Sequence, residues 1–163
     1  GIKTGRCFIF ESSWRHTTMA SPLAAGLASD VCIHSDLGSG TAALECALEG
    51  TPTLLIDREG CHESKLYELP KDKVIFKNWE EAITVLMEHL KTPNGIPGFG
   101  DWSSIIDELD PFRDGKAAQR MGNYLNWLIQ GFEKGMDKEV IMSDAAERYA
   151  KEWGSDKVIT NNN

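Results

Sequence analysis

A strand, a glycine turn, a helix and a second strand follow one another over residues 30–57, and this order constrains the fold more than any other stretch. Residues 30–34 and 53–57 are short runs rich in apolar and β-branched side chains, which is typical of strands buried in a sheet. Between them, residues 42–48 are mostly good helix formers, and Gly50 follows where a helix end favours a left-handed residue. The length of this crossover predicts that the two strands pair in parallel.

The turn that opens this helix is suited to binding an anion. Gly38 and Gly40 have no Cβ, so the backbone can turn tightly and bring its N–H groups close to a ligand, where the positive end of the helix dipole also points. Thr41 adds a hydroxyl, and Glu45 lies one turn further along the same helix face. The glycines alone fit any tight turn of an α/β domain. Together with Thr41, Glu45 and the closing Gly-Thr-Pro, they favour a site for a diphosphate and a ribose.

The pattern over residues 38–52, Gly-x-Gly-Thr-x-x-x-Glu-x-x-x-x-Gly-x-Pro, resembles the donor-binding signature in the C-terminal half of GT-B glycosyltransferases and the related UDP-N-acetylglucosamine 2-epimerases. The resemblance implies an α/β fold, a Rossmann-like parallel sheet flanked by helices. It also implies a donor-binding site at Gly38, Ser39, Gly40, Thr41 and Glu45, with the diphosphate at the glycine turn and the ribose at the glutamate. Residues 35–38 stand where many members carry His-Gly-Gly, so the loop that faces the acceptor differs here.

This resemblance implies that the chain is the nucleotide-sugar-binding half of a glycosyltransferase. Residues 110–115, Asp-Pro-Phe-Arg-Asp-Gly, are similar to a phrase of bacterial capsule and surface-polysaccharide transferases. A nucleoside diphosphate sugar would then be the substrate, with no cofactor, and no catalytic base is recognisable. Two other classes stay open. One is a 2-epimerase-like isomerase, in which His62 or Glu63 would matter more, and the other is a non-catalytic α/β binding module.

Polar loops supply further candidates for contacts with the donor or its sugar. Loops that follow the carboxyl ends of parallel strands face the ligand crevice of an open α/β sheet, and residues 11–18 and 58–65 are two such loops. For any single side chain in them, an ordinary polar loop is the simpler interpretation. A metal site at residues 59–63 is not expected, because His-Glu lacks the second histidine of a zincin helix. The further candidates are Arg15, His16, Arg58, Glu59, His62 and Arg113.

Charge and cysteine usage exclude some classes of partner. A net charge of -8 and a pI near 5.0 argue against a nucleic-acid surface and against broad docking on an anionic membrane. No apolar run approaches the roughly 20 residues of a membrane span. Four cysteines are scattered without a Cys-x-x-Cys pair, which indicates a reducing cytoplasm. Those in apolar runs are interpreted as small core residues: Cys7, Cys32 and Cys46.

The chain of 163 residues is predicted to hold a nucleotide-sugar-binding core at residues 1–92 and a helical extension at 93–163, packed on the same domain. It begins with glycine rather than methionine and enters a predicted strand at residues 6–10. We therefore expect a piece of a larger protein, and the resemblance implies that the N-terminal acceptor-binding domain is the missing partner. The turn-rich residues 92–100 separate the two parts.

Two helices of the core have recognisable starts. Pro22 suits the first turn of a helix at residues 21–28. Asn78 is expected to cap the next helix, with Glu81 reaching back to it. An apolar face recurs along that helix at helical spacing and is predicted to belong to the core: Ile83, Leu86, Met87 and Leu90.

Helices are predicted in the extension at residues 101–109, 117–132 and 143–153, with Asp114 and Ser143 as caps of the last two. In the loop at 110–116, Arg113 either pairs with a neighbouring aspartate, Asp110 or Asp114, or it offers its charge to a donor phosphate, as Lys116 would. The aromatic residues of the last helix are either exposed or packed on the sheet; they are Tyr149 and Trp153.

Overall fold

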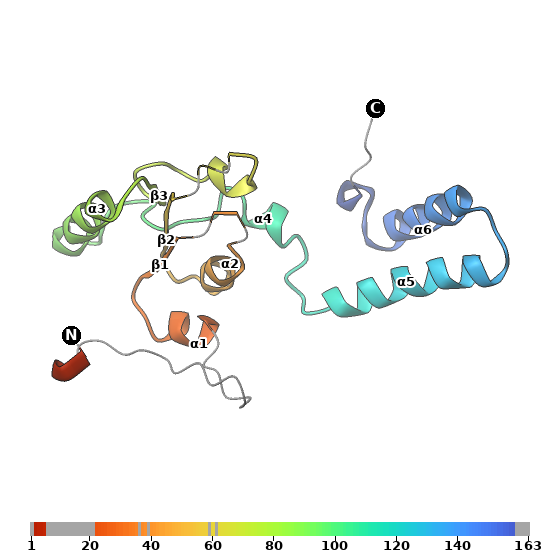
Figure 1. Ribbon diagram of the computed structural model, residues 1–163, viewed down its shortest axis with the longest axis horizontal. Coiled ribbons are helices and arrows are strands. Elements are labelled where there is room, and N and C mark those ends of the chain that lie inside the picture. Colours follow the sequence, from red (N-terminus) through yellow and green to blue (C-terminus); the bar gives the residue numbers. More distant parts are fainter. Residues whose placement is uncertain are drawn as a thin grey trace. The chain divides into compact units, whose positions relative to one another are not determined.

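The computed structural model describes residues 2–5, 22–35, 37, 38, 40–58, 60 and 62–158. The chain divides into two compact units, Gly1–Ile106 and Asp107–Asn163 (Figure 1). The predicted strand at residues 6–10 and the polar loop at 11–18 lie outside the described residues. No helix in the described part of the chain is both long and apolar enough to span a bilayer.

The first unit is a mixed α/β structure built on a small parallel sheet. Among the described residues the sheet has three strands in the order β1 (Cys32–His34), β2 (Thr53–Ile56) and β3 (Ile75–Phe76). Cys32 aligns with Thr53, and Leu55 aligns with Ile75, both in parallel register. All four residues of β2 are buried, as expected of a central parallel strand covered on both faces. The parallel pairing predicted for residues 30–57 is confirmed.

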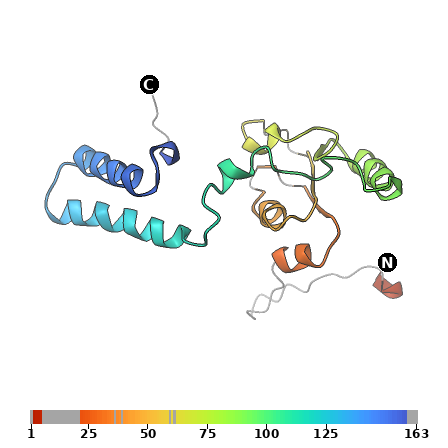
Figure 2. The ribbon, with the colours of Figure 1, turned by 180° about the vertical axis from the view of Figure 1, so that it is seen from behind.

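Helices cover both faces of this sheet. Figures 1 and 2 show α1 (Pro22–Leu27) and α2 (Thr41–Leu48) on one side and α3 (Trp79–Lys91) on the other. A 3₁₀ turn, η2 (Lys65–Glu68), lies in the connection between β2 and β3. The core between the sheet and α3 consists of Leu54, Ile56, Phe76, Ala82 and Phe99.

The turn-rich segment after α3 belongs to the first unit. The Thr53 N–H donates to the Gly100 carbonyl at 3.0 Å, and Trp102 Nε1 donates to the Thr53 carbonyl at 2.9 Å. Gly100 has a φ of 66°, and a Cβ on it would lie 2.6 Å from the Thr53 nitrogen. Only glycine fits this close approach of two backbones. The unit therefore continues to Ile106, beyond the boundary that the sequence analysis places at residues 92 and 93.

The start of α3 confirms the predicted cap. Asn78 Oδ1 accepts from the Glu81 N–H at 2.9 Å. The Glu81 carboxylate returns to the Lys77 N–H at 3.1 Å and to the Asn78 side-chain amide at 3.1 Å. The Glu81 carboxylate thus accepts from the backbone N–H one residue before the cap, and the side chains of Asn78 and Glu81 together hold the start of the helix.

The prediction that the apolar face of α3 belongs to the core is wrong for three of its four residues. Ile83, Met87 and Leu90 are 50%, 47% and 65% exposed, and only Leu86 packs on the core cluster, beside Val85. The helix thus has two apolar stripes. The narrow sheet covers the one that contains Ala82, Val85 and Leu86 and leaves Ile83, Met87 and Leu90 exposed.

The second unit is a helical hairpin. α4 (Ile106–Leu109) begins at the boundary, and α5 (Ala117–Glu133) and α6 (Lys138–Trp153) follow, with a 3₁₀ turn at η3 (Ser155–Lys157). Of the helix predicted at residues 101–109, only the last four residues are α-helical. A Cβ on Gly131 of α5 would lie 2.7 Å from Ile141 Cγ1 of α6, so the two helices cross closely there.

Aromatic rings hold the open end of the hairpin together. The rings of Trp127 and Trp153 stack with centroids 5.5 Å apart, and Tyr149 packs edge-on against Trp153 at 4.7 Å. Tyr149 also packs edge-on against Tyr124 of α5 with ring centroids 6.0 Å apart, so Tyr149 and Trp153 both pack on α5, an arrangement that the sequence analysis does not anticipate.

The prediction that Ser143 caps the last helix is also wrong. α6 begins at Lys138, because Gly135 ends the preceding helix with a φ of 69° and the Asp137 carboxylate then accepts from the Glu139 N–H at 2.9 Å.

Candidate functional site

The glycine turn leads from the carboxyl end of β1 into α2. Gly40 is the N-cap of α2 and adopts a left-handed conformation, with φ 43° and ψ 15°. Its carbonyl accepts from the Leu44 N–H at 2.8 Å, but it has no side chain with which to cap the helix amides. A helix start of this kind presents N–H groups and the positive end of the dipole to a ligand.

The loop before this turn is anchored by Leu37. Its side chain is fully buried, so moving this residue into solvent would expose a large apolar side chain. Gly38, next in the chain, is exposed. Ser39, which the sequence analysis places among the phosphate contacts, lies outside the described residues.

Two exposed polar side chains follow on α2. Thr41 is the first residue of the helix and Glu45 lies one turn later, so both share a face near the glycine turn. The structure thus brings four of the five predicted donor-binding residues, Gly38, Gly40, Thr41 and Glu45, to one helix start at the carboxyl edge of the sheet. Hydroxyl, carboxylate and backbone amides together are able to bind a phosphate and a vicinal diol.

A hollow of about 310 Å³ lies beside the carboxyl ends of β2 and β3. Asp57, directly after β2, accepts from the Tyr67 hydroxyl at 2.6 Å and from the Gly60 N–H at 3.0 Å. The His62 ring packs edge-on against Tyr67 with centroids 4.7 Å apart. Lys71 and Lys77 also line the hollow, as do Asp72 and Glu81, so it offers hydrogen-bonding groups and charges of both signs.

The other candidates are spread more widely. Arg58 is exposed and does not line this hollow, whereas His62 does. Arg15, His16 and Glu59 lie outside the described residues. Sequence reasoning names His62 but does not anticipate Tyr67 or the two lysines, because their approach depends on the path of the loop.

Arg113 belongs to the second unit, and its guanidinium contacts residues nearby in the chain. Its Nε donates to the Asp110 carbonyl at 3.4 Å, and its guanidinium forms an ion pair with Asp107. The local pairing weighed in the sequence analysis is therefore present, although with the Asp110 backbone and Asp107 rather than with the Asp110 or Asp114 carboxylates.

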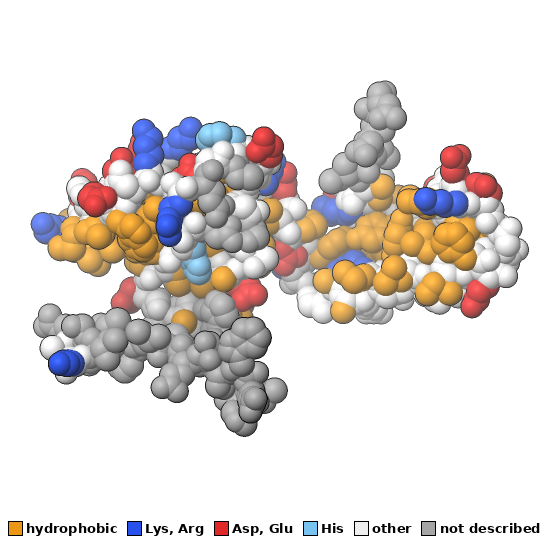
Figure 3. Space-filling view, viewed as in Figure 1, with side chains coloured by type: hydrophobic (Ala, Val, Ile, Leu, Met, Phe, Trp, Pro, Cys, Tyr) orange, Lys and Arg blue, Asp and Glu red, His pale blue; other side chains and the backbone are white. Residues whose placement is uncertain are grey.

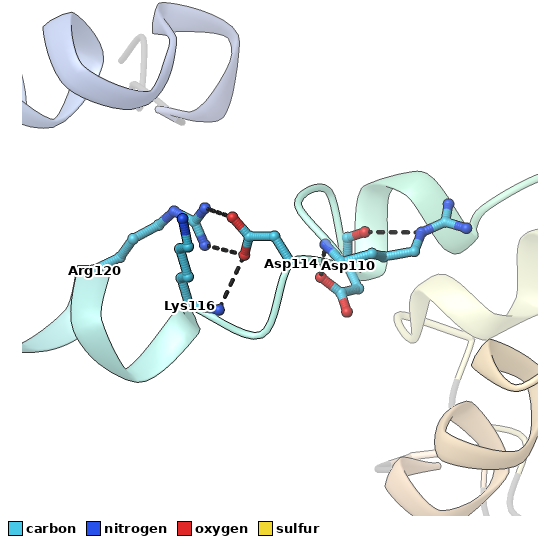
Figure 4. A network of polar contacts seen from close by, with 5 residues as sticks. Asp110, Asp114, Lys116 and Arg120 are labelled. Atoms are coloured by element: carbon cyan, nitrogen blue, oxygen red, sulfur yellow. Dashed lines mark hydrogen bonds and ion pairs between the residues drawn. The ribbon is translucent and has the colours of Figure 1, made fainter.

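Asp114 pairs with Arg120 instead. One Asp114 oxygen accepts from Arg120 Nη1 at 3.0 Å and also from the Lys116 N–H at 3.0 Å, and Arg120 Nη2 bonds the other (Figure 4). Arg120 is only 8% exposed, and its guanidinium lies 3.6 Å from the centre of the Phe112 ring. These hydrogen bonds, that from Arg120 first, lower the pKa of Asp114 to about 2. Asp114 thus tethers the start of α5, although the N-cap itself is Lys116.

A cluster that sequence reasoning missed joins β1 to α2. Cys32 and His34 are two residues apart on β1 and so share a face, and Cys46 of α2 is buried. The two sulfur atoms and an imidazole nitrogen all lie within 4.8 Å of one another, and among the described residues this is the one group of three or more His, Cys, Asp or Glu side chains arranged to hold a metal ion. Burial, followed by the neighbouring Cys32, raises the pKa of Cys46 to about 11, and burial lowers the pKa of His34. Cys-x-His on a strand is the sequence signal that points to it.

Comparison of the chain with known proteins found no matching protein family, no matching curated protein and no matching solved structure.

Proposed function

We propose that the first unit is a Rossmann-like nucleotide-sugar-binding domain, the donor half of a GT-B glycosyltransferase that makes a surface polysaccharide. The observation that carries this proposal is the start of α2. There an uncapped helix follows a glycine turn at the carboxyl edge of a parallel sheet, and Thr41 and Glu45 are exposed on its first turns. The sequence pattern at residues 38–52 supports the same assignment.

The chemistry follows from the charge that develops in sugar transfer. When the bond between the sugar and the diphosphate breaks, negative charge grows on the departing nucleoside diphosphate. Helix amides and the Thr41 hydroxyl stabilise that charge without reorganising, and Glu45 positions the nucleoside by accepting hydrogen bonds from the ribose hydroxyls. The hollow lined by His62 and Tyr67 is proposed to receive the sugar.

Ligand binding tests this proposal directly. The chain is titrated with UDP, GDP, CMP and their sugar conjugates while its thermal unfolding is followed. A nucleotide at a hundred times its Kd stabilises the folded protein by about 2.7 kcal/mol. We expect one nucleotide to do so and Glu45→Ala to abolish the effect.

The matched control is Glu49→Ala, which removes an exposed carboxylate from the other end of the same helix. This variant should respond to the nucleotide as the native chain does. Equal responses of the Glu45 and Glu49 variants, or no response to any nucleotide at millimolar concentration, would contradict a donor site at α2 and favour a non-catalytic binding module.

A second candidate is an isomerase similar to the UDP-N-acetylglucosamine 2-epimerases. The observation that favours it is the position of His62 beside Asp57 and Tyr67 in one hollow, where an imidazole is placed to move a proton on a bound sugar. Incorporation of deuterium from solvent into the sugar of UDP-N-acetylglucosamine, followed by NMR, separates this activity from sugar transfer.

A further inference from the structure

The cluster of Cys32, His34 and Cys46 brings together three side chains of the types that bind transition-metal ions. The strand brings Cys32 and His34 to the same face of the sheet, and α2 crosses that face with Cys46 pointing inward. If the cysteines served only as small core residues, packing alone would explain them. Packing gives no reason for an imidazole nitrogen and both sulfur atoms to lie within 4.8 Å of one another.

We propose that Cys32, His34 and Cys46 form a binding site for a soft divalent transition-metal ion of the zinc class. Two thiolates and one imidazole are a donor set that Zn²⁺ prefers, and three protein ligands leave a fourth tetrahedral position for water. The proposal is independent of the nucleotide site.

The geometry requires only small movements. With Zn–S bonds of about 2.3 Å and Zn–N bonds of about 2.0 Å, tetrahedral ligand atoms lie about 3.5–3.8 Å apart. The three donor atoms already lie within 4.8 Å, so shifts of about 1 Å, within reach of ordinary side-chain rotations, would close the shell. On binding, each thiol gives its proton to solvent and its sulfur lone pair to the metal, so one ion displaces two protons.

α1 covers the sulfur side of the cluster, while Cys32 and His34 are half-buried. Gly26 of α1 is buried against both sulfur atoms, since a Cβ there would lie 2.5 Å from Cys46 Sγ and 3.5 Å from Cys32 Sγ. The ion would thus lie beneath α1 and join β1 to α2, the helix whose start is the proposed donor site. Its role is to hold that helix on the sheet.

Cobalt titration of the reduced full chain tests the site. We expect one Co²⁺ per chain to give a thiolate-to-cobalt charge-transfer band together with the intense d–d bands of tetrahedral cobalt. One equivalent of Zn²⁺ should remove both. Cys46→Ala and Cys32→Ala should each weaken cobalt binding at least tenfold and reduce the charge-transfer band, since only one thiolate remains, while far-UV circular dichroism confirms that the variants fold. Cys7→Ala and Cys61→Ala are the matched controls and should behave as the native chain.

A second measurement needs no variant. Zn²⁺ should protect Cys32, which is only half-buried, from alkylation of the native chain, as read by peptide mass spectrometry, and leave Cys7 and Cys61 as reactive as before. The proposal is overturned if cobalt gives no charge-transfer band, if Cys32→Ala and Cys46→Ala both bind cobalt as tightly and with as strong a band as the native chain, or if Zn²⁺ leaves Cys32 as reactive as before.

Discussion

The two units of this chain bury their apolar side chains to very different degrees. In the α/β unit, Leu54, Ile56 and Phe76 are almost fully buried between the sheet and α3. In the helical hairpin, four large apolar side chains along α5 are each at least half exposed: Met121, Leu125, Ile129 and Phe132. Figure 3 shows hydrophobic side chains at the surface of this unit. A sheet covered on both faces makes a closed core, whereas two helices alone cover only one side of each other. The α/β unit thus has a closed core, although α3 leaves one apolar stripe exposed, whereas α5 and α6 are held together by a few close contacts.

Matched phenylalanines give the largest expected difference between the units. Phe76→Ala removes a ring that is 2% exposed in the sheet core and should cost about 3–5 kcal/mol of unfolding free energy. Phe132→Ala removes one that is 57% exposed and should cost less than about 1 kcal/mol. Urea denaturation measures both. Similar costs for the two variants would mean that the α5 stripe is covered in solution.

Matched glycines in the left-handed region give the next largest difference. Gly100→Ala places a Cβ 2.6 Å from the Thr53 backbone, whereas Gly135→Ala meets nothing within 4 Å. The positive φ should lower the unfolding free energy of both variants by about 1–2 kcal/mol. The clash beside β2 should lower that of Gly100→Ala by about 1–3 kcal/mol more. Thermal unfolding measures the Tm of each variant. Equal decreases in Tm would show that the segment at 96–106 moves to relieve the clash at little cost.

Within the hairpin, two helical glycines should have effects of opposite sign. Gly131→Ala forces a methyl group to within 2.7 Å of Ile141 and should destabilise the pairing of α5 and α6 by about 1–3 kcal/mol. Gly122→Ala meets nothing and should stabilise α5 by about 0.5–1 kcal/mol through helix propensity. Far-UV circular dichroism during heating reports both changes. If both substitutions stabilise the chain, the close crossing at Gly131 does not hold.

The smallest expected effect concerns pH at the start of α5. Arg120 holds the pKa of Asp114 at about 2, below its ordinary value of 3.8, so the ionised carboxylate favours the folded state. That contribution is complete above pH 3.8 and is lost as the pH falls from 3.8 towards 2. Asp114→Asn should remove this part of the pH dependence of unfolding. An unchanged acid profile in the variant would mean that the pair adds nothing to stability.

Local features of the fold were predictable because neighbouring residues decide them. The parallel strands at β1 and β2, the helix that starts after Gly40 and the cap at Asn78 all depend on short stretches of chain. Four predicted donor-binding residues reach one helix start for the same reason, since they lie within eight positions of one another. The cap of α6 was missed although it is local, because Asp137 competes with Ser143 and the turn at Gly135 settles the choice.

Features that join distant stretches were not predictable in the same way. The pattern at Ile83, Met87 and Leu90 shows that α3 has an apolar stripe, but the width of the sheet decides which stripe is buried. Tyr67 reaches Asp57 only through the path of the connecting loop.

By itself, the sequence determined the order of strand, turn, helix and strand over residues 30–57 and the starts of α2 and α3, since dihedral preferences and short-range hydrogen bonds act within a few residues. The tertiary structure alone decided that the side chains of Cys32, His34 and Cys46 lie close together and that Gly100 lies against Thr53. Such meetings depend on how a strand and a helix cross, and the crossing is a property of the packed sheet as a whole.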